Sequence, residues 1–340
     1  MAVWQCAAGD GNRDYADVFL KYGVFLVGPG SDGPYFGNEG AYNDPDSASC
    51  RPFIKPFAEH LAIGDRLILK RPSSQQWEIL AVGEVVSDYL HSQVFADVEG
   101  WDLQHCRSVR WKTPRSQEIV GGLTRGTLKG VNIPSVIAAA DQVWTSGQDA
   151  ATTPLPIERK RISVDEVVDA LMSEGIPVQR AQLMTDTIWR LRRVAQWYQT
   201  HGADVGEHEI RTFLIVPLLT SLGWAEQKVK IEWNRMDVVL FDTAYKRCVS
   251  NPLVIIESKR LFDGMRHAAD QASVYAKAYP SCQRFIVSDG IRYKLFVRDG
   301  QGWRFSAYMN LLYPMQSHPY EENVEGAVAF FKAMIPGLEV

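Results

Sequence analysis

The sequence predicts a two-domain α+β protein, in which a small N-terminal β-barrel with helices precedes an α/β domain built on a central mixed sheet. Its 340 residues are long enough for two average domains. Short alternating apolar runs characterise the N-terminal part, whereas helix and strand patterns alternate after residue 163. Between these parts the apolar periodicity is lost around Pro154 and Pro156. We therefore expect domains over 1–144 and 163–340, joined by a linker over 145–162.

The composition is that of an ordinary globular protein, with 46% apolar and 22% charged residues, which excludes a disordered or fibrous chain. The net charge of −4 means that a nucleic acid would have to bind to local basic patches. The five cysteines form no Cys-x-x-Cys pair, which argues against a zinc or redox site and favours a cytoplasmic location. No apolar stretch approaches the ~20 residues that cross a bilayer, so we expect no membrane partner.

The N-terminal strands are predicted from apolar runs that are bounded by Gly and Pro. Such runs occupy residues 23–28, 66–70 and 78–86. Residues 28–57 are instead rich in Gly, Pro, Asp and Ser, with isolated aromatic residues. This composition predicts a long loop rather than an element of the core.

The second domain begins with two helices within 164–202, predicted over 164–175 and 181–202 from apolar spacings of three and four. A third helix over 207–222 ends before Gly223. The remaining elements alternate in type, which predicts an α/β layer with a mixed sheet. They are strands over 226–233, 236–242 and 252–258, a helix over 264–279, and strands over 284–289, 292–298 and 303–309.

Two carboxylates and a lysine near the strand ends form the most informative pattern. Asp237 opens one apolar strand, Glu257 ends another, and Lys259 follows two positions later. Because residues i and i+2 of a strand share a face, Glu257 and Lys259 should project together. Two carboxylates suit Mg²⁺, and the lysine could orient or deprotonate water, or stabilise charge on a phosphate. The alternative is structural, with Asp237 capping a turn and Glu257 paired to Lys259.

The surrounding motifs give this pattern a family resemblance. Glu207 and Arg211 share one helical face ahead of Pro-Leu-Leu and Leu-Gly-Trp, and Ser-Asp-Gly occupies 288–290. With the Asp, the Ile-Glu-x-Lys and a Gln-x-x-x-Tyr helix in the same order, residues 207–298 resemble the PD-(D/E)XK nuclease domain at the N-terminus of type I restriction enzyme R subunits. The chain has no GxxxxGK[ST] loop, so we expect no use of ATP.

The resemblance implies Mg²⁺-dependent DNA cleavage, with Mn²⁺ as a possible substitute. It implies Asp237 and Glu257 as metal ligands and Lys259 as the catalytic lysine. It also implies an acid on the preceding helix, for which Glu207 is preferred by its spacing although Glu209 lies on the same helix. The residues that it implies at the DNA are Gln271 and Tyr275.

The N-terminal domain resembles the EVE and YTH-like branch of the PUA-like fold, through GDRLILKR at 64–71, ILAVGEV at 79–85, WDLQHCRSVRW at 101–111 and KYGVFL at 21–26. These domains hold a flipped, often methylated base between aromatic side chains. The candidate base-binding residues are Trp4, Asn12, Phe25, Tyr89 and Trp101. The candidate DNA-phosphate contacts are Arg107, Arg110, Lys112 and Arg115. Trp111 is assigned to the core, and His105 to a hydrogen-bonded structural role rather than to a metal.

Together the two resemblances predict a modification-dependent, type IV-like restriction endonuclease. The N-terminal domain would read a modified base in double-stranded DNA, most simply 5-methylcytosine or 5-hydroxymethylcytosine, and the C-terminal domain would cut nearby. One nuclease site cuts one strand, so a homodimer is expected at least on DNA. Two alternatives stay open, a non-catalytic reader with a nuclease scaffold and a nuclease that acts on RNA.

Overall fold

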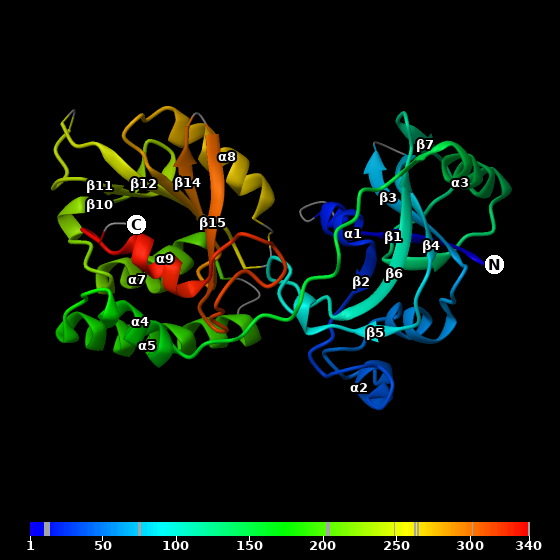
Figure 1. Cartoon of the computed structure of the whole chain (residues 1–340), viewed down its shortest axis with the longest axis horizontal. Helices are drawn as coiled ribbons and strands as arrows, with labels where there is room; N and C mark the ends of the chain where they lie inside the picture. Colours follow the sequence, from blue (N-terminus) through cyan, green and yellow to red (C-terminus); the bar gives the residue numbers. More distant parts are fainter. Residues whose placement is uncertain are drawn as a thin grey trace. The chain divides into compact units, whose positions relative to one another are not determined.

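The computed structural model describes residues 1–9, 14–73, 76–201, 205–247, 249–261, 263, 265–300 and 302–338. The chain divides into two compact units, Met1–Ile157 and Glu158–Val340, and each has its own sheet (Figure 1). Mixed α/β structure in two parts is therefore present, as the sequence predicts. Within the described ranges, no helix combines the length and the apolar character needed to span a membrane.

The first unit is built around a strongly curled sheet (Figure 1). Its described helices and strands are β1 (Val3–Ala7), α1 (Ala16–Tyr22), β2 (Val24–Val27), α2 (Glu39–Asn43), β3 (Arg66–Ser73), β4 (Gln76–Val85), β5 (Leu90–His91), β6 (His105–Thr113), β7 (Glu118–Val120), β8 (Leu128–Gly130), α3 (Pro134–Ser146) and β9 (Gln148–Asp149). The main strand order is β2-β6-β4-β3-β1-β8, in which β1 and β3 run parallel. Helix α3 packs on this sheet through Val136, Ala140 and Val143.

Trp111 lies in this core, as predicted from the sequence. Its side chain is 1% exposed, and its indole N–H donates to the carbonyl of Val24 at 3.1 Å. Gly83 on the neighbouring strand makes room for the ring, because a Cβ there would lie 2.5 Å from it. A glycine within a strand often marks such a close approach.

The segment 28–57 is more ordered than the predicted loop. It contains α2, and Tyr35 and Tyr42 are 0% and 2% exposed in a small cluster of their own. Both hydroxyls donate hydrogen bonds of 2.6 Å, to Glu59 and to the carbonyl of Gly33 respectively. Tyrosine can be buried when its hydroxyl finds an acceptor, so a core can form here without any apolar periodicity in the sequence.

The predicted linker over 145–162 is largely incorporated into the two units. Helix α3 continues to Ser146, β9 pairs with β6, and the N–H of Thr153 donates to the carbonyl of Lys21. On the other side, the N–H of Ile162 donates to the carbonyl of Pro314. Both ends of the predicted linker are therefore paired within a unit, and residues 151–160 between them have no helix or strand.

The second unit contains a six-stranded mixed sheet. Its described helices and strands are α4 (Val164–Ser173), α5 (Val178–His201), α6 (Glu207–Ile210), α7 (Val216–Ser221), β10 (Val229–Trp233), β11 (Met236–Phe241), β12 (Pro252–Ser258), α8 (Arg266–Lys277), β13 (Arg284–Ser288), β14 (Arg292–Asp299), β15 (Gly302–Asn310) and α9 (Ala327–Met334). The strands follow chain order across the sheet, with β12 and β13 parallel and the other neighbouring pairs antiparallel. The π-helical turn Arg211–Ile215 joins α6 to α7.

Helices cover both faces of this sheet (Figure 1). Helices α4, α5, α7 and α9 contribute to one large apolar cluster with the sheet. On the opposite face, α8 packs through the small side chains Ala268, Ala272 and Ala276. In the resulting three-layer arrangement, the start of β11 and the end of β12 lie beside the π-helical turn that follows α6.

Candidate active site

The pairing of β11 with β12 brings the predicted acids together. Val238 lies opposite Ile256 in this antiparallel pair, and continuing the register by one residue places Asp237 opposite Glu257. Lys259 follows directly after β12, where its N–H donates to the carbonyl of Ser288 on β13 at 2.9 Å. Asp237, Glu257 and Lys259 therefore lie together where β11 begins and β12 ends.

Asp237 is held by hydrogen bonds to both carboxylate oxygens. The N–H and the hydroxyl of Ser258 donate to Oδ2 at 2.7 and 2.8 Å. The guanidinium of Arg211 donates to Oδ1. The Asp237 side chain is 16% exposed, so these bonds fix it in a partly buried position. Ser258 is the middle residue of Glu-x-Lys, and its role was not predicted because spacing alone does not specify that position.

Glu257 is a buried carboxylate with one oxygen that lacks a partner. Its side chain is 4% exposed, and Oε1 accepts a hydrogen bond of 2.8 Å from Nζ of Lys259. Oε2 is buried without a hydrogen-bond partner. Burial raises the pKa of Glu257, and the charges of Asp237 and Glu207 raise it further against the opposing effect of Lys259. A positive ion next to Oε2 would stabilise the ionised carboxylate.

Lys259 is held in its charged form. Burial lowers its pKa, but the hydrogen bond to Glu257 and the charges of Glu257, Glu207 and Asp237 outweigh burial, and the resulting pKa is above the ordinary lysine value. A lysine with a raised pKa is a poor general base at neutral pH. Of the roles considered from the sequence, orientation of water and stabilisation of negative charge fit this environment better than removal of a proton.

The structure distinguishes the two acids of α6. The charge of Glu207 acts on both Glu257 and Lys259, so Glu207 lies near the predicted catalytic group. The charge of Glu209 instead acts on Tyr198 of α5. These electrostatic effects favour Glu207 over Glu209, and the assignment of the helix acid remains a prediction.

The Ser-Asp-Gly motif occupies the end of β13 and the turn that follows it. Asp289 accepts hydrogen bonds from the N–H groups of Ile291 and Arg292 and closes the turn into β14. Gly290 has φ +82°, and a Cβ there would lie 2.8 Å from side-chain atoms of Leu214. The turn can pack closely against the segment that follows Glu207 because this residue has no side chain.

Gln271 and Tyr275 lie next to each other on α8. The Gln271 side-chain amide donates to the Tyr275 hydroxyl at 3.2 Å, at the exposed surface of the helix. In the part of the chain that the structure describes, no hydrogen bond joins this pair to Asp237, Glu257 or Lys259. Their contact with DNA remains a prediction.

The donor set fits a magnesium ion better than a transition metal. Among the described residues there is no group of three or more His, Cys, Asp and Glu side chains that could hold a metal. Mg²⁺ commonly uses only one or two carboxylates and takes its other ligands from water and phosphate. Asp237 and Glu257 supply such a pair, and the partnerless Oε2 of Glu257 is the observation that supports it.

The predicted phosphate contacts of the first unit are only partly on the surface. Arg107 is 4% exposed and donates to the carbonyls of Phe57 and Ala58, so its assignment as a phosphate contact is wrong. It shares the inward face of β6 with Val109 and Trp111, because alternate strand residues point the same way. The other members differ from it in exposure: Arg110 is exposed and paired with Glu84, Lys112 is half-buried near Trp144, and Arg115 is exposed.

The predicted base cage does not form as one cluster. Phe25 is 0% exposed and packs against Phe19 and Phe57, so it has no surface to offer a base and its assignment is wrong. Trp4 lies on β1 and donates its indole N–H to Asp65 at 3.0 Å. The remaining candidates are Tyr89, which is half-buried, Trp101, in a turn that pairs with Val98, and Asn12, which lies outside the described residues.

Tyr89 belongs to a buried hydrogen-bond chain with His105. His105 Nε2 lies 2.8 Å from the carbonyl of Pro29 and must carry the proton, so Nδ1 accepts from the Tyr89 hydroxyl at 2.6 Å. The Tyr89 oxygen in turn accepts from the N–H of Tyr35 at 2.7 Å. Burial lowers the pKa of His105 to about 4, and the residue is therefore a neutral structural group.

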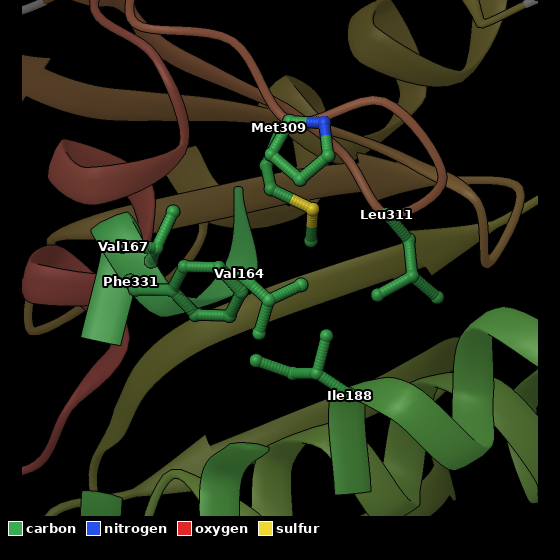
Figure 2. Close-up of a pocket in the computed structure, with 7 residues that line it drawn as sticks. Val164, Val167, Ile188, Met309, Leu311 and Phe331 are labelled. Carbon is green, nitrogen blue, oxygen red and sulfur yellow. The ribbon is translucent and has the colours of Figure 1, made fainter. Parts of the chain in front are cut away.

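A small cavity lies within the second unit, between α4, α5, α9 and β15 (Figure 2). It measures about 10 Å³, which is about the size of one water molecule. Its lining is entirely apolar and includes Val164, Ile188 and Met309. Such a space is a dry packing defect, and it has no polar group with which to orient a substrate.

No protein-family model matches this chain, and no curated protein matches it closely enough to count as a relative. The functional argument therefore depends on the chemistry of the site itself. Asp237, Glu257 and Lys259 are joined by contacts across two strands, and Glu207 lies within electrostatic range of them.

Proposed function

We propose that this protein is a Mg²⁺-dependent deoxyribonuclease that cuts double-stranded DNA carrying a modified base. The observation that carries the proposal is the buried carboxylate of Glu257, which has one oxygen without a partner and lies between Lys259 and Asp237. An ion pair that served only stability would be expected to satisfy both carboxylate oxygens. A divalent cation would supply the missing partner.

The residues would divide the work of phosphodiester hydrolysis as follows. Asp237 and Glu257 would hold Mg²⁺, which when bound polarises a phosphate oxygen and lowers the pKa of water. Ser258 keeps Asp237 in place through two hydrogen bonds. The ammonium of Lys259 would stabilise negative charge that develops on the phosphate. Glu207 would orient a water molecule at the edge of the site.

Recognition of a modified base is proposed for the first unit on the basis of its sequence resemblance over residues 21–111. Trp4, Tyr89 and Trp101 are the aromatic candidates that keep some exposed surface. Arg110 and Arg115 are exposed cations that could contact the DNA backbone. Because one catalytic site cuts one strand, a double-strand break would require two copies of the chain.

Substitution of the proposed catalytic residues tests the nuclease activity. Asp237→Ala and Lys259→Ala should each abolish Mg²⁺-dependent cleavage while binding to modified DNA remains. Lys246→Ala, at an exposed lysine of the same unit, is the matched control and should cleave normally. Continued cleavage by both site variants would exclude this unit as the catalyst.

Matched substrates test the specificity. Duplexes that differ only in unmodified cytosine, 5-methylcytosine or 5-hydroxymethylcytosine should be cut at very different rates, and an RNA of the same sequence should not be cut. Equal rates on all DNA duplexes would contradict the reading of a modified base. Preferential cleavage of the RNA would support the RNA-directed alternative instead.

A further inference from the structure

Arg211 is the least exposed cation of the proposed catalytic site. Its side chain is 5% exposed, and its Nη1 donates to Oδ1 of Asp237. Its Nη2 donates to Glu232 at 3.1 Å and to Nδ1 of His208 at 2.8 Å. Arg211 thus connects the partly buried Asp237 to Glu232 and His208. The Glu232 and His208 side chains are 58% and 77% exposed.

The backbone around this contact departs from regular geometry on both sides. Arg211 begins the π-helical turn between α6 and α7, and such turns occur frequently at functional sites. Glu232 has φ +54°, a left-handed conformation that is unfavourable for a residue with a side chain. Asn234 and Arg235 also have positive φ, but they form the two-residue turn between β10 and β11, where this geometry is ordinary. The conformation of Glu232 costs free energy, and such residues cluster at functional sites.

The charges show what the guanidinium does to the acid group. With all three acids ionised, Glu207, Asp237 and Glu257 would carry three negative charges, which the ammonium of Lys259 would reduce to two. That balance suits a divalent cation. The guanidinium of Arg211 neutralises one more negative charge and donates a hydrogen bond to Oδ1 of Asp237. Asp237 is one of the two carboxylates that would bind the metal.

We infer that Arg211 competes with the divalent cation for Oδ1 of Asp237 and thereby sets the metal affinity of the site. This inference rests on the proposed function, because it takes Asp237 and Glu257 as the metal ligands. A bound cation would take Oδ1 from the guanidinium, and Glu232 and His208 would remain as acceptors for Nη2. Arg211 is therefore a residue that tunes metal binding, and it need not touch the substrate.

Two substitutions should move the metal affinity in opposite directions. Arg211→Met keeps an unbranched stem for the buried position but removes the guanidinium and its competing charge, so the Mg²⁺ concentration at half-saturation should fall about tenfold, the equivalent of one charge-assisted hydrogen bond. Glu232→Gln keeps a carbonyl acceptor but removes the negative charge that faces Nη2, which leaves the guanidinium of Arg211 more tightly paired with Asp237, so the half-saturating concentration should rise. Arg211→Lys keeps a charge and should stay close to the wild type.

The measurement is a Mg²⁺ titration of the full-length protein followed by its thermal unfolding, with Mn²⁺ binding by electron paramagnetic resonance as a second readout. Neither requires cleavage. A rise in the half-saturating concentration for Arg211→Met, or no change, would overturn the inference and make Arg211 a support for Asp237. If Arg211→Met does not fold, Glu232→Gln still decides the question: its half-saturating concentration should lie above that of the wild type and of Arg211→Lys, and equal values would overturn the inference.

Asp237→Asn separates this inference from the proposed function. If the wild type binds Mg²⁺ and Asp237→Asn does not, the metal site stands and the Arg211 variants alone decide the inference. If the wild type shows no binding of Mg²⁺ or Mn²⁺, the proposed function and the inference both fail.

Discussion

Replacement of Glu257 by Gln should make the metal-free protein more stable while it abolishes metal binding. The Glu257 carboxylate is 4% exposed, and its Oε2 has no hydrogen-bond partner. Burial and the charges of Asp237 and Glu207 raise its pKa, so its ionised form is unfavourable in the folded state. Glutamine keeps the shape and an acceptor for Nζ of Lys259 but removes the negative charge.

The size of the effect follows from two opposing contributions. An ionised oxygen that is buried without a partner costs more than the about 1–3 kcal/mol of a neutral polar group, and the Gln amide in its place keeps the neutral cost, so removal of the charge should gain about 2 kcal/mol. Loss of the charge also weakens the bond to Lys259, whose side chain is 22% exposed and regains some solvation, at a cost of about 1 kcal/mol. We therefore expect a net stabilisation of about 1 kcal/mol. For a unit of this size that corresponds to a rise of about 2–4 °C in the unfolding temperature.

Scanning calorimetry of the full-length protein in EDTA and in Mg²⁺ measures both consequences. Glu257→Gln should unfold at a higher temperature than the wild type in EDTA, show no further rise with Mg²⁺, and cut no DNA. Glu322→Gln, at an exposed acid of the same unit, is the charge-matched control and should behave as the wild type. A lower unfolding temperature in EDTA together with a retained Mg²⁺ response would mean that Glu257 and Lys259 form a structural ion pair.

Three further outcomes are expected. Because burial lowers the pKa of His105 from 6.5 to about 4, the first unit should lose stability as the pH falls from 6.5 towards 4, by up to about 3 kcal/mol, and chemical denaturation of His105→Gln should show a flatter pH profile. Gly290→Ala should destabilise the second unit by about 1–3 kcal/mol in urea unfolding, since a Cβ at φ +82° would meet Leu214 at 2.8 Å. Ile188→Val, beside the apolar cavity, should cost about 1 kcal/mol in the same assay and leave the cleavage rate of folded protein unchanged, and a lost activity would show that the cavity binds a ligand.

Much of the second unit could be predicted because its elements follow simple periodicities. The predicted strand over 252–258 matches β12, and the helix over 264–279 contains α8. In the first unit the predicted strand over 66–70 lies within β3, and the one over 78–86 overlaps β4. The segment 28–57 was missed because its buried tyrosines depend on hydrogen bonds to distant residues and not on a repeating apolar pattern.

The candidate site was predictable where strand geometry alone determines it. The spacing of Glu257 and Lys259 predicted their proximity, and the two side chains are 2.8 Å apart. Arg107 was misassigned although its alternation with Val109 and Trp111 indicated an inward side chain, because the run of basic residues was given more weight than the strand period. The contact of Arg211 with Asp237 required knowledge of how α6 packs on the sheet, which sequence spacing does not contain.

The close arrangement of the acids lowers the folding stability of the second unit. Glu207, Asp237 and Glu257 act on one another as like charges in a partly buried site, which favours their separation or protonation. They are held together by the register of β11 with β12, by the two hydrogen bonds from Ser258 to Asp237, and by the close packing that Gly290 permits. Chain segments that resist relaxation in this way keep the acids in place before any ligand arrives, so a cation would have to displace Arg211 from Asp237 but would not have to gather the acids. The cost in folding free energy is thus the physical basis of the metal affinity that we propose.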